Sequence, residues 1–297
     1  MAGVGDWELV GIPYTSMQRP GGIADAIGVL RASQLGERLT ALGVVDGGDL
    51  PTSGPDGTRG PSGLLNEKPL SELVVRTRER VSLVHSRGRR PLLVGGDCPV
   101  LLGPLAAIRD SGERPGLVML DGHEDAWPPD RSDTGEASDS EVAIALGLVS
   151  ELPEPLAGLT PILDASAIAM LGPRDLAEIA TADVPTMRDQ VAFFADDREA
   201  RSGPAAELIG AALAAIEADG FWLHVDLDVL SEESLAAVDY PQPEGWSWGQ
   251  LDELAAATAR DSACRGVSVV IYNPDRDPDR SGAHEVVDFV ARLIAAC

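Results

Sequence analysis

Short apolar runs alternate along the chain with longer segments whose apolar residues recur at helical spacing. We predict strands at 7–12, 91–97, 117–120, 167–171, from 221 onward and 266–272. We predict helices at 21–43, 70–86, 100–111, 141–149, 205–219, 248–260 and 282–296, and polar loops at 47–63 and 128–139. Such alternation indicates an α/β fold with a central parallel sheet covered by helices on both faces. We find no repeats and no clear linker, so we expect a single domain over residues 1–297.

The apolar run at 117–120 ends abruptly in three polar residues that can bind metal. Asp121, His123 and Asp125 stand at alternate positions. In an extended segment the side chains at i, i+2 and i+4 point the same way. Two carboxylates and an imidazole suit a divalent ion such as manganese, zinc or iron. Taken alone, the segment fits a polar loop that caps a strand equally well.

Two further strands end in residues of the same kind. The run at 91–94 leads to Cys98, and the run at 220–225 leads to Asp226 and Asp228. A buried carboxylate without a partner costs on the order of several kcal/mol, so a shared metal explains why such groups would gather. Parallel strands bring their carboxyl ends to one edge of the sheet, where open α/β sheets build their sites.

The composition narrows the possible partners. The formal net charge is −25, and Lys68 is the only lysine. So acidic a chain does not suit nucleic acid or an anionic membrane, whereas it attracts small cations. Cys98, Cys264 and Cys297 are sparse and have no disulfide spacing, which favours a reducing, cytoplasmic location. We find no secretory signal at the N-terminus and no membrane span in the sequence.

Together the three strand ends resemble the ureohydrolase family, which includes arginase, agmatinase and formiminoglutamase. The family pattern is Gly-Gly-Asp-His, Asp-Ala-His-x-Asp and Asp-x-Asp. Here it reads Gly-Gly-Asp-Cys at 95–98, Asp-Gly-His-Glu-Asp at 121–125 and Asp-Leu-Asp at 226–228. Weaker similarity covers 10–14, 172–175 and 240–245. The resemblance implies a three-layer αβα arginase-like fold and a homo-oligomer, either a trimer or a hexamer.

The resemblance also implies two divalent metal ions, with manganese the first choice, that share a hydroxide which attacks a carbon bonded to nitrogen. By resemblance the first ion is held by Cys98, Asp121, Asp125 and Asp226, and the second by Asp121, His123, Asp226 and Asp228. Asp121 and Asp226 would bridge the ions, and Asp125 would also accept a hydrogen bond from the hydroxide.

Cys98 is the first departure from the family, which has histidine at this position. A thiolate is a softer ligand and favours zinc or iron over manganese. Three other interpretations stay open: a weakly bound first ion, an oxidisable thiol, or an inert buried thiol in a degenerate site.

The substrate side departs further. In the family, an acid before Asn-Pro in the last strand pairs with the guanidinium group, and here that position is Ile271. Acids that read the substrate's amino group are replaced by Ala177 and Ala180. The proton-shuttle histidine is absent, with Ser138 or Asp139 nearby, and we take Asp139 as the candidate. A buried cation needs a partner, so we predict that ordinary arginase activity is absent or very weak.

Other residues near the motifs allow two interpretations each. His224 stands two positions before Asp226, and it either orients a metal-binding carboxylate or is a hydrogen-bonded core histidine. We include it among the candidate catalytic residues. We expect Glu124, between two ligands, to face solvent or a subunit contact. Three tryptophans flank the site loops, and at least one should pack in the core: Trp127, Trp246 and Trp248.

Three functions remain in competition. The first is a binuclear metal-dependent hydrolase that cleaves a C–N bond of a guanidino, hydroxyguanidino or amidino small molecule other than L-arginine. The second is a catalytically silent family member that binds metal or a partner and regulates or scaffolds. The third is a metal-independent hydrolase that uses Cys98 with a histidine base, which leaves the aspartate cluster unexplained.

Overall fold

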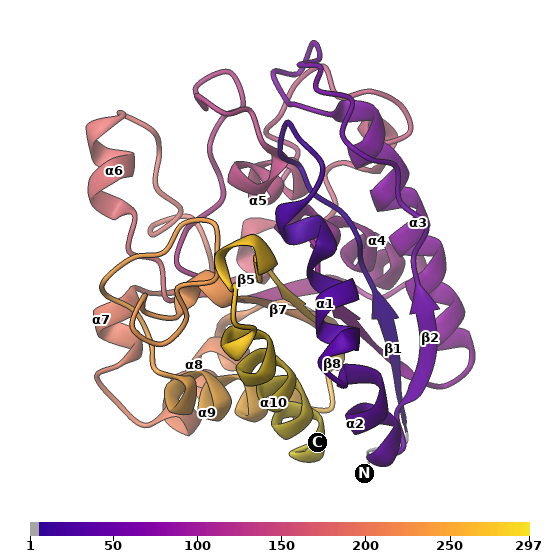
Figure 1. Cartoon of the computed structure of the whole chain (residues 1–297). Coiled ribbons are helices and arrows are strands. Elements are labelled where there is room, and N and C mark those ends of the chain that lie inside the picture. The colour runs from indigo at the N-terminus through magenta and orange to yellow at the C-terminus, as the bar shows by residue number, and fades with distance from the viewer. Residues whose placement is uncertain (1–5) are drawn as a thin grey trace.

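The computed structural model describes residues 6–297, and its eight strands form one sheet (Figure 1). The strand order is β2-β1-β3-β8-β7-β4-β5-β6, and every neighbouring pair is parallel. The strands are β1 (Trp7–Gly11), β2 (Val45–Asp49), β3 (Arg90–Val94), β4 (Pro115–Leu120), β5 (Ile168–Leu171), β6 (Phe193–Ala195), β7 (Gly220–Asp226) and β8 (Cys264–Val270). The predicted α/β fold with a parallel sheet is therefore confirmed.

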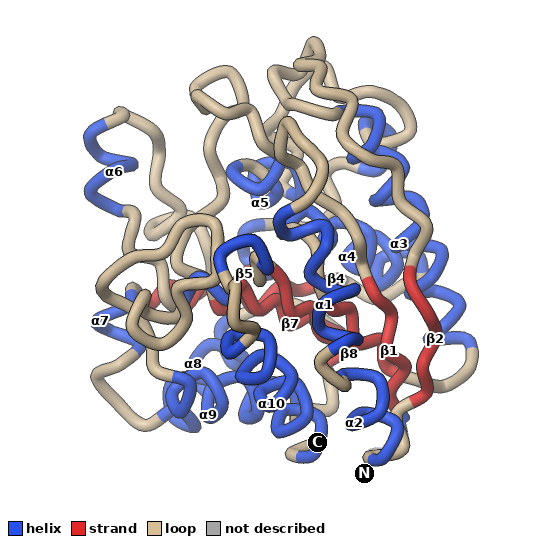
Figure 2. The backbone as a smooth tube through the Cα atoms, viewed as in Figure 1, coloured by secondary structure: helices blue, strands red, loops and turns tan. Residues whose placement is uncertain are grey.

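Helices lie on both sides of this sheet (Figure 2). Helices α3 and α4 pack against each other and against strands of the sheet, while α8, α9 and α10 form a second group that α1 and α2 extend. The helices are α1 (Ala26–Ala32), α2 (Leu35–Ala41), α3 (Glu67–Ser86), α4 (Leu102–Asp110), α5 (Glu141–Ala145), α6 (Leu176–Thr181), α7 (Asp197–Ala200), α8 (Ala205–Ala215), α9 (Trp248–Ala259) and α10 (Ser281–Ala295).

The central strands are buried from end to end. Every residue of β4 and β7 is buried, which is why both are mostly apolar rather than alternating, with His224 and Asp226 as the polar residues of β7. Trp222 of β7 and Phe289 of α10 are both fully buried. The ends of these buried strands carry the candidate ligands.

Several predicted elements differ from the observed ones. The helix predicted at 21–43 is two short helices, because Gln34 adopts a left-handed backbone (φ 72°) that ends α1 and starts α2. Strand β2 begins before the loop predicted at 47–63 and runs into it. It is a largely exposed edge strand rich in glycine, so it lacks an apolar signal. Helix α5 stops at Ala145, earlier than expected, and Gly147 then turns the chain with φ 72°.

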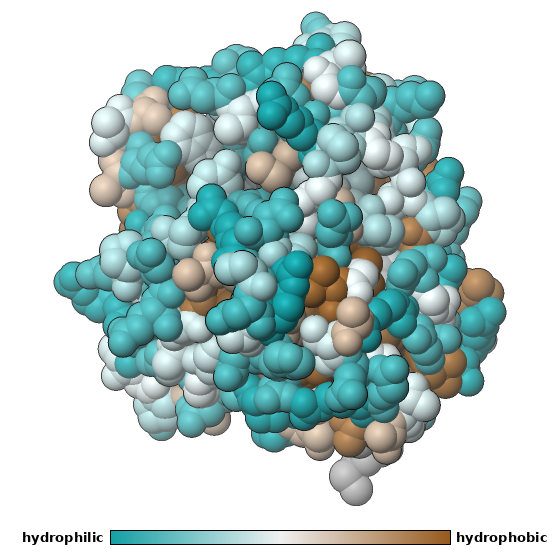
Figure 3. Space-filling view, viewed as in Figure 1, coloured by the Kyte–Doolittle hydropathy of each residue, from teal (hydrophilic) through white to brown (hydrophobic). Residues whose placement is uncertain are grey.

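The first residues and the surface complete the description. Residues 1–5, part of the predicted domain and of the N-terminus in which we found no secretory signal, lie outside the described residues. Across 6–297, none of the helices combines the length and the apolar character needed to cross a bilayer. The face shown in Figure 3 is mostly hydrophilic, with apolar residues scattered among polar ones, in keeping with the charged composition.

Candidate metal centre

The three motif-bearing strands end at the same level of the sheet. Val225 of β7 pairs with Leu120 of β4 and with Val269 of β8, and Val269 pairs in turn with Val94 of β3. The residues at this level and just beyond it therefore meet at one edge. They form what we call the strand-end cluster: Cys98, Asp121, His123, Asp125, His224, Asp226 and Asp228.

A tight turn after β3 presents the thiol of Cys98 to this cluster. Gly96 has a φ of 75°, and a Cβ atom there would lie 2.7 Å from the Ile12 carbonyl oxygen, so only glycine fits. The Asp97 carboxylate accepts hydrogen bonds from the backbone N–H of Ser16 at 2.6 Å and of Cys98 at 3.0 Å. The turn is thus fixed before any ligand binds.

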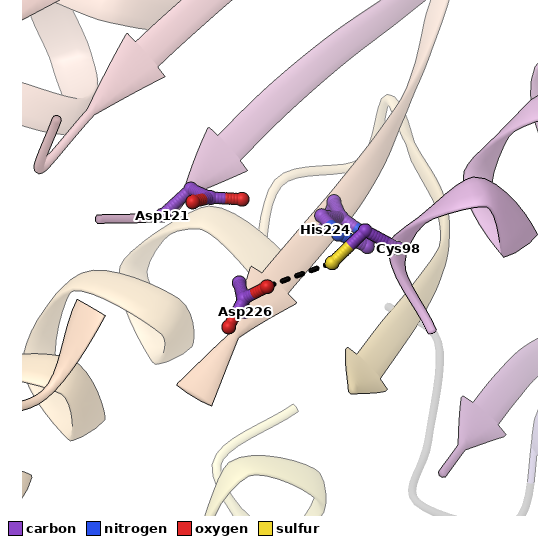
Figure 4. A group of neighbouring side chains, drawn as sticks. All are labelled: Cys98, Asp121, His224 and Asp226. Carbon is purple, nitrogen blue, oxygen red and sulfur yellow. Dashed lines mark hydrogen bonds between the residues drawn. The ribbon is translucent and has the colours of Figure 1, made fainter. Parts of the chain in front are cut away.

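Four of the cluster residues offer a ligand atom to one point (Figure 4). The ligand atoms of Cys98, Asp121, His224 and Asp226 all lie within 4.8 Å of one another, and all four residues are buried. The Cys98 thiol donates a hydrogen bond to Asp226 Oδ2 at 2.7 Å. A sulfur, an imidazole and two carboxylates at this spacing suit a divalent transition metal.

His123 faces a second group of carboxylates. Its Nδ1 lies 3.0 Å from Asp228 Oδ2 and 3.9 Å from Asp121 Oδ1. Burial by itself would lower the pKa of His123, but Asp228 and Asp121 outweigh it and raise that pKa to about 10. Asp121, His123 and Asp125 also meet within 4.8 Å. Asp121 belongs to both groups, which is the position of a bridging ligand.

Asp125 reaches the cluster by a route that differs from our expectation. We predicted an extended segment at 121–125, but the chain leaves β4 after Leu120 and Asp125 has a φ of 46°. The positive φ is unusual for a non-glycine residue and is typical of strained functional sites. It turns the Asp125 carboxyl toward Glu141 rather than letting strand alternation align it.

Glu141 is a member of the site that sequence reasoning missed. It is the first residue of α5 and is fully buried, and one of its oxygens lies within 4.8 Å of ligand atoms of Cys98 and Asp125. Burial raises the pKa of Glu141 well above its usual range, and it does the same for Asp125, whose pKa Glu141 raises further. In the sequence Glu141 resembles an ordinary acid in the first turn of a helix.

The buried polar atoms of the cluster test whether a metal fits. Among the described residues, Asp121 Oδ2, His224 Nε2 and both Glu141 oxygens are buried and make no well-formed hydrogen bond. Burial raises the pKa of Asp121 to about 8, and the neighbouring Asp228 adds to this rise. A divalent cation would give Asp121 Oδ2 and His224 Nε2 a partner and would reverse the mutual repulsion of the carboxylates. The donor set therefore fits bound metal.

A cavity of about 220 Å³ opens above the cluster and is strongly acidic. Outside the strand-end cluster, six residues of the lining form what we call the cavity wall: Glu136, Asp139, Glu178, Asp239, Tyr240 and Ile271. Burial raises the pKa of Glu136 to about 7, and the nearby carboxylates of Asp97, Asp139 and Asp239 add to this rise. Arg131 also lines the cavity, but its guanidinium donates to the carbonyls of Asp183 and Ala182 at 2.8 Å each.

Comparison with known sequences and structures identifies the family. A sequence profile of the arginase family matches residues 6–296. The chain belongs to the arginase family. Arginase from Bacillus caldovelox is 28% identical over 175 residues, so the alignment spans 58% of this chain and 58% of that protein. A solved structure of Bacillus caldovelox arginase covers 97% of both chains with a TM-score of 0.82 at 23% identity.

Two further relatives of this arginase-family protein extend the comparison. Arginase from Brevibacillus brevis is 27% identical over 298 residues and is covered to 96%, as is this chain. The N(omega)-hydroxy-L-arginine amidinohydrolase of Streptomyces lavendulae is 26% identical over 226 residues, which is 75% of each chain. The predicted resemblance to ureohydrolases is thereby confirmed.

The remaining predicted site residues of this arginase-family protein are placed as follows. The Asp139 carboxylate accepts hydrogen bonds from the hydroxyls of Ser132 and Thr134 at 2.6 Å each, and it lines the cavity outside the metal-binding groups. Ser138 Oγ lies 3.1 Å from Ser16 Oγ. Asp139 is thus a residue of the wall, and its catalytic role stays a prediction.

The expectation for Glu124 is wrong. This carboxylate is buried and accepts hydrogen bonds from Thr186 Oγ at 2.5 Å and from the backbone N–H of Met187 at 2.6 Å. It faces neither solvent nor a free surface, because it anchors the loop that leads to β6. The alternation of side chains correctly predicted that Glu124 points away from the cluster. It could not predict which loop would pack against this carboxylate.

Helix α6 and one of the three tryptophans contribute side chains to the cavity lining. Ala177 and Ala180 are exposed on α6, but Glu178 of the same helix lines the cavity, so an acid from this helix is present after all. Trp246 is fully buried, and the Trp248 ring packs 5.7 Å from that of Phe289, which confirms that at least one tryptophan belongs to the core. Trp127 is half-buried and lines the cavity.

Proposed function

We propose that this arginase-family protein is a binuclear metal-dependent hydrolase that cleaves a C–N bond of a guanidino, hydroxyguanidino or amidino small molecule other than L-arginine. The observation that carries the proposal is the convergence of the cluster's carboxylates, thiol and imidazoles, several of whose buried atoms have no other partner. Burial of so many charged and polar groups would destabilise the folded protein unless they bind metal.

In this proposal Asp121 and Asp226 bridge the two ions. Cys98 and Asp125 complete the first position, and His123 and Asp228 complete the second. The short distance from His123 to Asp228, 3.0 Å, and the contact of Cys98 with Asp226 support this division. Manganese suits the second position, which has three carboxylates and an imidazole, whereas the thiolate favours zinc or iron at the first.

The reaction requires the transfer of one proton from the attacking water to the leaving nitrogen. When bound, the two ions supply an activated water and positive charge for the developing negative charge. Asp125 and Glu141 lie side by side, and burial raises the pKa of both, which favours a proton on the pair. Asp125 takes the proton of the attacking water, and the pair returns a proton to the nitrogen of the leaving amine as the C–N bond breaks.

The cavity wall supports a cationic substrate. Glu136, Glu178 and Asp239 place carboxylates around the cavity, and the guanidinium of Arg131 is bound to backbone carbonyls. A substrate with a free carboxylate would meet repulsion there, whereas an amidinium, a guanidinium or a distant ammonium group would be attracted. Ile271 lines the cavity where the family acid would stand. Both features support the exclusion of L-arginine.

The proposal includes a small-molecule substrate and no nucleic acid or membrane partner. The homo-oligomer, either trimer or hexamer, stays a prediction. All three cysteines are unpaired, which supports the expectation of a reducing, cytoplasmic location.

The first test is metal stoichiometry by elemental mass spectrometry on protein purified without chelators. We expect two equivalents in the wild type and fewer in Cys98→Ser. The matched control is Cys264→Ser, which removes a buried thiol of β8 outside the cluster and should leave the stoichiometry unchanged. Protein that binds no metal, even after manganese or zinc is added back, would contradict the proposal.

The second test is turnover on a panel of guanidino, hydroxyguanidino and amidino compounds, with L-arginine included. The name of the Streptomyces lavendulae relative justifies the hydroxyguanidines in that panel. We expect amine release from at least one cationic compound and little or no urea from L-arginine. Robust urea release from L-arginine would overturn the substrate class.

One alternative has support of its own. Ile271 in place of the acid and the absence of the shuttle histidine, with Ser138 or Asp139 nearby, favour a catalytically silent, metal-binding member with a regulatory or scaffold role. Bound metal without turnover on the whole panel would support it. The metal-independent cysteine mechanism is disfavoured, because burial and then Asp226 raise the pKa of the Cys98 thiol and suppress the thiolate that would attack.

A further inference from the structure

We infer that His224 is a direct metal ligand, and that it supplies from β7 the nitrogen donor that the family pattern places at position 98. The inference rests on the binuclear centre of the proposed function. It changes the first position to a set of Cys98, Asp121, His224 and Asp226, and it leaves Asp125 to pair with Glu141.

The placement of the ring supports direct binding. His224 and Asp226 are two residues apart on β7, so their side chains project from the same face of the strand. Figure 4 shows the His224 ring beside the Cys98 thiol, with Asp121 across from them. The four ligand atoms lie within 4.8 Å of one another. Neighbouring ligands of a tetrahedral zinc site lie roughly 3.3–3.8 Å apart, so small side-chain shifts close the site.

The hydrogen bonds of the ring leave one nitrogen for a metal. His224 Nδ1 lies 2.7 Å from Ser268 Oγ, and Ser268 Oγ also accepts a hydrogen bond from Trp222 Nε1 at 2.9 Å. When Nδ1–H donates to Ser268, the lone pair of Nε2 is free. A protein acceptor on the far nitrogen is the usual support of a metal-binding histidine.

A purely structural histidine does not account for the other ring nitrogen. His224 is fully buried, and Nε2 has no hydrogen-bond partner among residues 6–297. An unpaired polar atom in the core costs free energy that an apolar side chain would avoid. A ligand role removes that cost, and it explains why the imidazole stands beside the one position where the family histidine is missing.

The inferred ligand set makes the two metal positions chemically unlike. Sulfur, imidazole nitrogen and two carboxylate oxygens suit zinc or ferrous iron. The other position has His123 with carboxylates and accepts a harder ion such as manganese. A protein offered both metals should therefore bind one of each, with the softer ion on the Cys98 side.

X-ray absorption at the zinc edge tests the inference without any activity measurement. The sample is the His123→Asn variant with one equivalent of zinc, which removes the imidazole of the second position. Two other histidines remain, and both lie away from the cluster: His85 Nε2 bonds the Arg265 carbonyl at 2.8 Å, and His284 is exposed on α10. We expect one sulfur and one imidazole around the zinc.

The outcomes separate the inference from the proposed function. A zinc ion with sulfur but no imidazole overturns the inference alone, whereas protein that binds no zinc overturns both. If His123→Asn fails to fold, the wild type with two equivalents of zinc decides the matter. Two imidazoles shared by the two ions support the inference, and one imidazole contradicts it.

A matched pair of variants provides an independent readout. Competition with a chelator should show that His224→Gln raises the zinc dissociation constant by more than about 100-fold, beyond the range of residues that only orient a ligand. The control, His85→Gln, removes a histidine of similar bonding outside the cluster and should leave the constant unchanged. A change below about tenfold in His224→Gln would contradict direct binding.

Discussion

The strand-end cluster and the cavity wall line the same cavity, yet they preserve the family pattern to different degrees. The candidate ligands of the cluster lie in or near the ends of β3, β4 and β7, and the register of the sheet brings those strand ends to one level. The wall is built mostly from loops, and there Ile271 replaces an acid while Glu136 and Asp239 contribute acids of their own. A rigid sheet edge thus keeps the metal-binding residues in place while loops are free to change the substrate.

The largest expected effect is the loss of bound metal when an aspartate of the strand-end cluster is replaced, compared with an aspartate of the cavity wall. Asp226→Asn removes a carboxylate shared by both metal positions, so we expect the loss of bound metal and a fall in kcat/KM of more than about 100-fold. Asp239→Asn, the matched change on the wall, should retain two equivalents of metal. Elemental analysis and panel kinetics on both variants make the comparison, and metal retained in Asp226→Asn would break it.

Glu141→Gln tests whether the cluster includes a proton-handling pair. The substitution keeps the size of the side chain but removes its proton exchange with Asp125. We expect kcat to fall by roughly 100-fold while the metal content stays at two equivalents. A loss of metal instead would make Glu141 a ligand rather than a partner of Asp125, and an unchanged kcat would remove it from the mechanism.

Ile271→Glu tests the wall by restoring the family acid. Ile271 has a φ of 71°, which is strained for a β-branched side chain, so glutamate should fit the backbone better. A charge-assisted hydrogen bond contributes about 1.5–3 kcal/mol. We therefore expect kcat/KM for guanidinium substrates to rise by about tenfold or more. Unchanged selectivity between guanidinium and neutral amidine substrates would show that this position does not read the substrate.

The sequence revealed the cluster because its signals are local. Each apolar run ends in polar residues of metal-binding type, and parallel strands must bring such ends together. Glu141 gave no signal, because its burial depends on how the loop between Asp125 and α5 folds back, with Val142 N–H donating to the Asp125 carbonyl. Glu124 was misjudged for the same reason. Asp125 does lie with Asp121 and His123, but the premise of that prediction was wrong, since Asp125 has a left-handed backbone and does not belong to an extended segment.

The smallest expected effect concerns pH and the wall. Burial raises the pKa of Glu136 to about 7, so its carboxyl is neutral below that pH and negative above it. Affinity for a cationic substrate should therefore rise as the pH increases through about 7, with KM falling about fivefold, as expected for one partly exposed ion pair. In Glu136→Gln this dependence should disappear, whereas Asp133→Asn, an exposed residue of the same cavity, should retain it.

The raised pKa of Glu136 should also make the stability of the protein depend on pH, which provides a second, independent test. Because the folded pKa of Glu136 exceeds its ordinary value of 4.5, the folded state binds its proton more tightly. The contribution to the free energy of unfolding is present below about pH 4.5 and is lost as the pH rises through about 7. Glu136→Gln should therefore raise Tm at pH 8 relative to the wild type more than it does at pH 5. If KM loses its pH dependence but this difference in Tm is absent, the titrating group that reads the substrate lies elsewhere on the wall.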